Sequence, residues 1–151
     1  DTWDVTKADM PDFKHLGDFG ASYNGKAYAI ASTNTMAGYP NLIPVGVVYE
    51  YDPGLDVWIT KASMPNPVCY KEVVEIGGKL IVITGATLST STTTDRVYEY
   101  NPVLDTWIYK GRFRYSQMGA GVAILGSKIY VAAGNSYGGK KDFLTSLDYP
   151  L

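Results

Sequence analysis

The side chains best suited to chemistry are few and scattered. His15 is the only histidine and Cys69 the only cysteine among the 151 residues. A metal site needs several clustered His, Cys or Asp ligands, and a general base needs a nucleophile or a paired acid beside it. No such cluster surrounds either residue in the sequence. We therefore expect no metal ion, no cofactor and no catalytic residues, and we favour a binding protein over an enzyme.

The polar residues of the chain suit ligand recognition better than they suit catalysis. Arg and Tyr together supply forked hydrogen-bond donors and flat apolar faces, and rigid scaffolds usually carry recognition on loops. Ordinary solvated surface is the alternative for each residue. The predicted partner-binding residues are Lys14, His15, Tyr70, Lys71, Arg112, Arg114 and Tyr115, in connections between repeats, and Asn34, Tyr39, Asn135 and Tyr137, in loops within repeats.

Composition limits the classes of partner that the chain is expected to bind. The formal net charge is −2 and no stretch concentrates Lys and Arg, so neither nucleic acid nor an anionic membrane surface is expected as a partner. No stretch is apolar enough to span a bilayer. One cysteine allows no intrachain disulfide, and no targeting segment is visible, so the compartment stays open. Thirteen tyrosines and three tryptophans favour strands.

The elements that position these residues come from a repeat. Asp-x-Trp occurs at residues 1–3, 56–58 and 105–107. Residues 48–53 (Val-Tyr-Glu-Tyr-Asp-Pro) and 97–102 (Val-Tyr-Glu-Tyr-Asn-Pro) precede the second and third copies. Residues 147–151 resemble the same run, cut off before its Asp-x-Trp. A repeat of about 50 residues is typical of propeller blades.

Tight turns divide each repeat further. Asn24-Gly25, Gly77-Gly78 and Gly126-Ser127 each lie between two apolar runs, as hairpin turns do. Each repeat therefore reads as four strands: a before the turn, b after it, c at the Tyr-rich run and d at the Trp. Strand a is expected to line a central channel, with b–c loops at 33–44, 86–95 and 135–142. The fold class is all-β.

These landmarks resemble the kelch family of β-propellers. The resemblance rests on a Tyr before an Asp/Asn-Pro turn, a Trp seven residues later, and a pair of small residues after strand b. The chain departs from the family's pattern at two places. The usual Gly-Gly is Ala31-Ser32, Thr84-Gly85 and Ala133-Gly134, and the usual Arg near strand a is His15, Val68 and Gln117.

The order of strands predicts an assembly. We expect a single kelch-type domain over 1–151, with strand d at 1–6 and blades at about 12–61, 66–110 and 115–151. Three blades are too few to close a ring, since propellers have about 4–8. A second copy would complete a six-bladed ring, with strand d of each copy closing the last blade of the other. The alternative is an excised half of a longer propeller.

Three functions remain open at this stage. The first is a non-enzymatic interaction scaffold that presents its b–c and d–a loops to a protein. The second is a carbohydrate-binding or sugar-converting propeller resembling kelch-type sialic acid epimerases, with Lys71, Arg114, His15 and Glu72 as the polar candidates at the channel mouth. The third is an excised or engineered half-propeller with no activity of its own.

Overall fold

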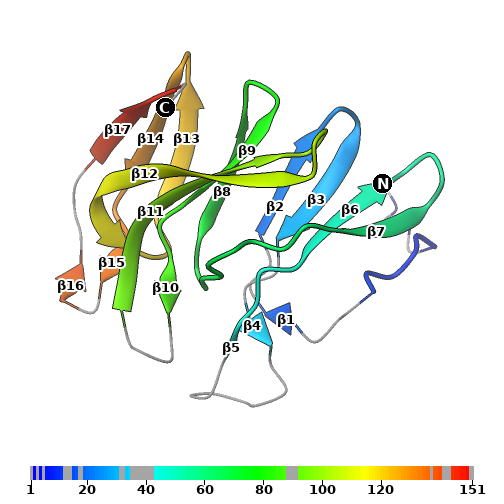
Figure 1. Cartoon of the computed structure of the whole chain (residues 1–151), viewed down its shortest axis with the longest axis horizontal. Coiled ribbons are helices and arrows are strands. Elements are labelled where there is room, and N and C mark those ends of the chain that lie inside the picture. The colour runs from blue at the N-terminus through cyan, green and yellow to red at the C-terminus, as the bar shows by residue number, and fades with distance from the viewer. Residues whose placement is uncertain are drawn as a thin grey trace.

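The computed structural model describes residues 2, 4, 6–11, 15–16, 19–30, 33–34, 43–87, 92–136, 138–140 and 144–149. All regular elements in this part of the chain are strands, and the main sheets stand side by side like blades (Figure 1). The all-β prediction is confirmed. No helix among the described residues is long and apolar enough to cross a membrane.

Each repeat forms one antiparallel sheet. Blade one has the order β2 (Phe19–Tyr23), β3 (Lys26–Ile30), β6 (Val48–Asp52) and β7 (Val57–Lys61). Blade two has the order β8 (Glu72–Ile76), β9 (Lys79–Ile83), β11 (Thr92–Asn101) and β12 (Thr106–Gln117). Blade three has β13 (Gly121–Leu125), β14 (Lys128–Ala132) and β17 (Leu144–Asp148).

The core lies between blades and is centred on β9. Successive side chains of a strand point to opposite faces of the sheet, and Leu80, Ile81, Val82 and Ile83 are all buried. Leu80 and Val82 join the apolar cluster shared with blade one, and Ile81 and Ile83 join the cluster shared with blade three. Strand b of the middle blade is therefore continuously apolar because both of its faces are covered.

The three b–c segments are not the plain loops that the sequence predicted. Each contains short strands: β4 (Thr33–Asn34) with β5 (Ile43–Pro44), β10 (Ala86–Thr87) with the start of β11, and β15 (Asn135–Ser136) with β16 (Gly139–Lys140). The Thr-rich residues 92–95 are strand because they pair with β10 and β12. β1 (His15–Leu16) pairs with β4 in blade one.

A second correction concerns Arg112, Arg114 and Tyr115. The sequence placed them in a connection between blades, but they lie on β12, which continues as far as Gln117. Gly111 sits at φ 125°, in the region that favours glycine, and the pairing register with β11 shifts beside it. The bulge bends the strand and lets the ladder continue.

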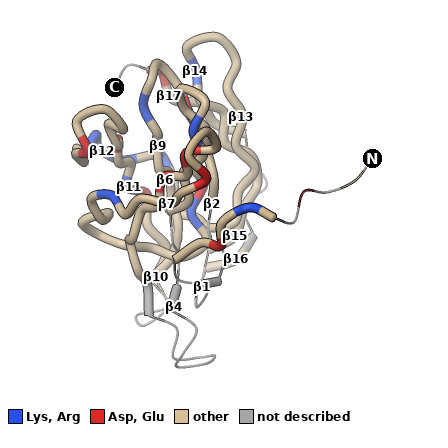
Figure 2. Tube along the Cα trace, turned by 90° about the vertical axis from the view of Figure 1, so that its right-hand side faces the viewer, with Lys and Arg blue, Asp and Glu red and all other residues tan. Residues whose placement is uncertain are grey.

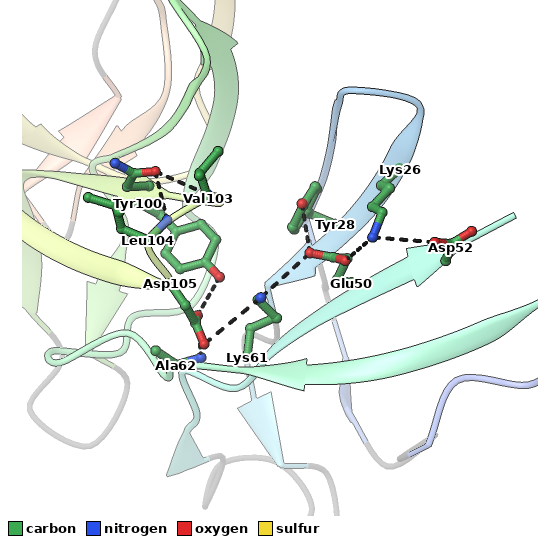
Figure 3. Close-up of polar contacts among 11 residues, drawn as sticks. Lys26, Tyr28, Glu50, Asp52, Lys61, Ala62, Tyr100, Val103, Leu104 and Asp105 are labelled. Carbon is green, nitrogen blue, oxygen red and sulfur yellow. Dashed lines mark hydrogen bonds and ion pairs between the residues drawn. The ribbon is translucent and has the colours of Figure 1, made fainter. Parts of the chain in front are cut away.

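A hydrogen-bonded clamp joins consecutive blades. Asp105 accepts from the hydroxyl of Tyr100 at 2.6 Å and from the backbone N–H of Ala62, at the exit of blade one, at 2.8 Å (Figure 3). Trp107 Nε1 donates to the carbonyl of Ala62 at 2.8 Å. Lys61 lies 4.0 Å from the Asp105 carboxylate and 3.7 Å from Glu50, so it links the two blades.

The same clamp occurs one repeat earlier. Asp56 accepts from the Tyr51 hydroxyl at 2.5 Å and from the N–H of Ala8 at 3.0 Å. Trp58 Nε1 donates to the carbonyl of Ala8 at 2.9 Å. In both copies the Asp-x-Trp of a blade therefore holds the segment that precedes that blade.

Buried charge accompanies the clamps. Glu50 is buried and accepts from Lys26 at 2.6 Å and from Tyr28 at 2.8 Å (Figure 3). Burial opposes ionisation, but these hydrogen bonds hold the pKa of Glu50 below its usual range. Over the described chain, Lys and Arg are interspersed with Asp and Glu (Figure 2).

Candidate functional site

A cleft of about 470 Å³ opens where blade one leads into blade two. One wall is the connection from Met64 to Val68, and the other is the outer part of blade two. Threonine hydroxyls, one amide and two guanidinium groups dominate its polar lining. The lining residues are Met64, Pro65, Asn66, Pro67, Val68, Thr84, Thr87, Thr92, Thr93, Thr94, Asp95, Arg96, Tyr98 and Arg112.

The β10–β11 hairpin brings the threonines into the cleft. Ala86 pairs with Thr93 and Thr87 with Thr92, while Cys69 forms a backbone bridge to Ala86. The hairpin is thereby tied to the start of blade two. Across the blade, Thr93 donates from its hydroxyl to Ser116 on β12 at 3.1 Å.

The first wall is held by close backbone packing. The N–H of Met64 donates to the carbonyl of Gly46 at 2.7 Å. A Cβ on Gly46 would lie 2.6 Å from the Met64 carbonyl oxygen, so only glycine permits this approach. Asn66 donates from its amide to the Tyr98 hydroxyl at 2.8 Å and so links the two walls of the cleft.

Thr84 is the most unusual residue of the lining. Its φ is +62°, a conformation that a β-branched residue adopts only at a cost of about 1–3 kcal/mol. The residue is 1% exposed, and its hydroxyl has no hydrogen-bond partner among the described residues. Its blade-three equivalent, Ala133, has φ +55°. Both occupy the position that glycine fills in the kelch pattern, so the backbone there keeps its left-handed form without glycine.

Arg96 and Arg112 supply the positive charge of the cleft. Arg112 is 66% exposed and lies 3.3 Å from the Asp95 carboxylate, an exposed ion pair that contributes little to stability. Arg96 approaches the Tyr98 hydroxyl at 3.5 Å, and no carboxylate pairs with it within the described residues. A smaller hollow of about 400 Å³ adjoins the cleft, sharing both arginines and adding the exposed ring of Tyr109.

The predicted site residues are spread over the structure. Of those whose side chains the structure describes, only Arg112 lines the cleft. Arg114 lies on β12 with its guanidinium 5.2 Å from the ring centre of Tyr115. The backbone of His15 pairs with that of Asn34 in the β1–β4 ladder, and Asn135 is exposed on β15. Lys14, Tyr39 and Tyr137 lie outside the described residues.

Lys71 and Tyr70 are neighbours with opposite exposure. Lys71 is fully buried and donates to the carbonyl of Val68 at 3.3 Å, so it is not on an accessible surface. Tyr70 is exposed at a φ of +51°. Burial raises the pKa of the Cys69 thiol to about 11, although Lys71 opposes the shift, so the thiol is protonated and unreactive at neutral pH.

One carboxylate at the start of blade two has an unusual acidity. Burial raises the pKa of Glu72 to about 7. No group of three or more His, Cys, Asp or Glu side chains in the described part of the chain could hold a metal ion.

Sequence reasoning missed most of the cleft. Asn66, Arg96 and Tyr98 gave no signal because their meeting depends on blade-to-blade packing. Thr84 did carry a signal: a β-branched residue stands where the repeat pattern has glycine. A residue that breaks the local backbone preference in this way marks a strained or functional position.

Comparison with known proteins supports the fold alone. No protein-family model and no curated protein matches the chain. The chain is similar to the β-propeller in the solved structure titled "Structure of YjhT", with a TM-score of 0.82, 18% sequence identity and 96% of this chain covered. The match covers 52% of that protein, so this chain spans about half its length. The β-propeller fold predicted from the repeat is confirmed.

Proposed function

We propose that this chain is a protein-binding module that holds an extended, carboxylate-bearing segment of its partner in the cleft between blades one and two. The observation that carries the proposal is the placement of two guanidinium groups, Arg96 and Arg112, on a cleft lined by hydroxyls. Guanidinium groups bind carboxylates through two parallel hydrogen bonds.

The exposure of the arginines favours binding of a ligand. Arg112 is 66% exposed, so its guanidinium can bind a carboxylate of the partner while it keeps its contact with Asp95, which is 24% exposed. Arg96 has only the Tyr98 hydroxyl as a weak partner among its described contacts.

The test is an array of extended twelve-residue peptides that differ in Glu and Asp content, read beside a glycan array. We expect binding to rise with carboxylate content and to fall about tenfold for Arg96→Gln and for Arg112→Gln, the loss of one charge-assisted hydrogen bond. Lys79→Gln, on β9 and outside the cleft, is the matched control and leaves binding unchanged. Peptide binding indifferent to both arginines, or no peptide binding at all, would overturn the proposal.

A carbohydrate ligand is the second candidate, because the lining is rich in hydroxyl groups and includes the Asn66 amide. Binding on the glycan array without peptide binding would favour it. The sugar-converting version has less support. It requires Lys71, Arg114, His15 and Glu72 to converge, whereas Lys71 is fully buried and Arg114 lies over Tyr115.

A further inference from the structure

Two arginines and two tyrosines lie together on one face of blade two. The register of β11 and β12 pairs Arg96 with Arg112 and Tyr98 with Tyr109. Residues opposite each other on antiparallel strands point to the same face of the sheet, as do residues two apart on one strand. All four side chains accordingly line the hollow of about 400 Å³ that adjoins the cleft. We call these four residues the Arg–Tyr square.

The square depends on the bulge in β12. Tyr109 and Arg112 are three residues apart, and on a regular strand such residues point to opposite faces. The register shift leaves Lys110 as the extra residue, so that Arg112 pairs with Arg96. In blade one, where the ladder has no register shift, Thr60 stands in place of Tyr109. The square is therefore a feature of blade two and not a general part of the repeat.

The arginine pair carries more charge than its neighbours balance. Like charges directly opposite each other destabilise a sheet. Asp95 lies 3.3 Å from Arg112, and it is the one carboxylate among the described residues that line the cleft or the hollow. Arg96 contacts the uncharged Tyr98 hydroxyl at 3.5 Å. One carboxylate from a ligand would balance the second guanidinium and relieve the repulsion between the two.

The tyrosine pair offers a flat apolar surface beside that charge. The ring centroids of Tyr98 and Tyr109 lie 5.5 Å apart, with the ring planes tilted by 58°. Tyr98 is buried and its hydroxyl accepts from the Asn66 amide, whereas Tyr109 is 52% exposed. Pro65, from the connection between the blades, also lines the hollow. Aromatic rings pack favourably on one another in offset or tilted arrangements, so the exposed ring of Tyr109 suits an aromatic side chain of a ligand.

The two pairs are spaced like alternate residues of an extended chain. Arg96 and Tyr98 are two residues apart on β11, which corresponds to a rise of about 6–7 Å. Side chains two apart on an extended peptide point the same way and are separated by the same rise. A partner segment that runs along β11 therefore meets the arginine pair with one side chain and the tyrosine pair with the next but one.

We infer that the partner segment carries an acidic residue and an aromatic residue separated by one residue. The carboxylate binds between Arg96 and Arg112, and the aromatic ring packs on Tyr109. This inference rests on the proposed function and adds to it the requirement for a ring at a fixed spacing. The spacing is the same for both directions of the segment, so both orders of the two residues satisfy it.

Twelve-residue peptides with one Glu and one Phe test the spacing. Phe stands one, two or three residues from Glu, in either order, and a reference peptide has Ala in place of Phe. Titration calorimetry should find about tenfold tighter binding than the reference when Phe is two residues away, and a smaller gain at the other spacings. Equal gains at every spacing, or no gain over a reference peptide that binds, would overturn the inference and leave the proposed function standing.

Variants of β12 separate the ring contact from the carboxylate contact. Tyr109→Ala should abolish the gain from Phe, whereas Arg96→Gln should weaken the Phe and reference peptides alike. Tyr109→Phe keeps the ring and should keep the gain. Ile108→Ala is the matched control, because Ile108 is also 52% exposed but points to the opposite face of the same strand.

Two results of the variant series would count against different claims. A gain from Phe that survives Tyr109→Ala, or that Ile108→Ala also abolishes, would contradict the placement of the ring. Binding of the reference peptide that Arg96→Gln does not weaken would instead refute the proposed function, on which the inference depends.

Discussion

The indole Nε1–H of Trp107 donates to the carbonyl oxygen of Ala62 at 2.8 Å, across 45 residues of sequence. Ala62 belongs to the exit of blade one, and Trp107 to the last strand of blade two. The ring of Trp107 also packs against Tyr100, with centroids 5.0 Å apart. The tryptophan of the repeat is therefore a joint between blades as well as part of the core.

Among the polar residues of this contact between blades, Asp105 should be the one whose substitution destabilises the fold most. Asp105→Ala removes the acceptor for Tyr100 and Ala62 and should lower the free energy of unfolding by about 2 kcal/mol, measured by urea denaturation. Asp105→Asn should cost less, because its amide oxygen can still accept. Asp148→Asn, whose carboxylate is 75% exposed, is the control and should have almost no effect.

The pH dependence of Asp105 follows from its contacts. Burial opposes its ionisation, but the bonds from Tyr100 and Ala62 hold its pKa below the ordinary value of 3.8. A depressed pKa stabilises the fold above that value, and the gain is lost as pH falls through the folded-state pKa. The deficit of Asp105→Asn should therefore shrink between pH 6 and pH 3. A deficit independent of pH would contradict this account.

Glu72 should change the pH dependence of stability in the opposite direction. Its pKa is raised by burial from 4.5 to about 7, so the folded state binds the proton more tightly and stability falls as pH rises from about 4.5 to about 7. Glu72→Gln removes this loss and should stabilise the protein at pH 8 by about 1–2 kcal/mol, a figure reduced for partial solvent screening. Parallel stability–pH curves for the two proteins would count against the burial argument.

Thr84 should separate stability from binding. Thr84→Gly relieves a β-branched residue at φ +62° and should raise the melting temperature, with a gain of about 1 kcal/mol after the extra entropy of glycine. Its hydroxyl is buried out of reach of a ligand, so peptide binding should stay unchanged. Ala133→Gly is matched in backbone position and should raise the melting temperature less, because alanine is not β-branched. Equal gains for the two variants would show that the β-branch of Thr84 adds no strain.

Gly46 should not tolerate a methyl group. Gly46→Ala places Cβ 2.6 Å from the carbonyl oxygen and 2.9 Å from the Cβ of Met64, and should destabilise the fold by about 1–3 kcal/mol. Gly20→Ala is the control, since its nearest contact would be an ordinary 3.5 Å from the Tyr28 carbonyl. Thermal melts compare the two variants. Equal melting points would show that the backbone at Met64 moves aside at little cost in stability.

The fold was predictable from the sequence because its signals are local. Turn glycines at 25 and 78 and the Tyr and Trp of each repeat mark strands without knowledge of their partners. The cleft was not predictable to the same extent. Asn66 and Tyr98 meet only through packing of blade one on blade two, and Arg112 reaches the cleft because Gly111 lets β12 continue. These outcomes depend on contacts between distant residues, which no short sequence pattern encodes.

The clamps also give the molecule a direction. Because Asp105 and Trp107 of blade two grip the segment at the exit of blade one, blade one is fastened by the blade that follows it. Repeat proteins derive much of their stability from such nearest-neighbour terms, and their least supported end opens first. Amide hydrogen exchange should therefore be slowest in β9, whose side chains are buried on both faces, and faster in β14 of blade three than in β3 of blade one, the blade that the clamp at Ala62 holds.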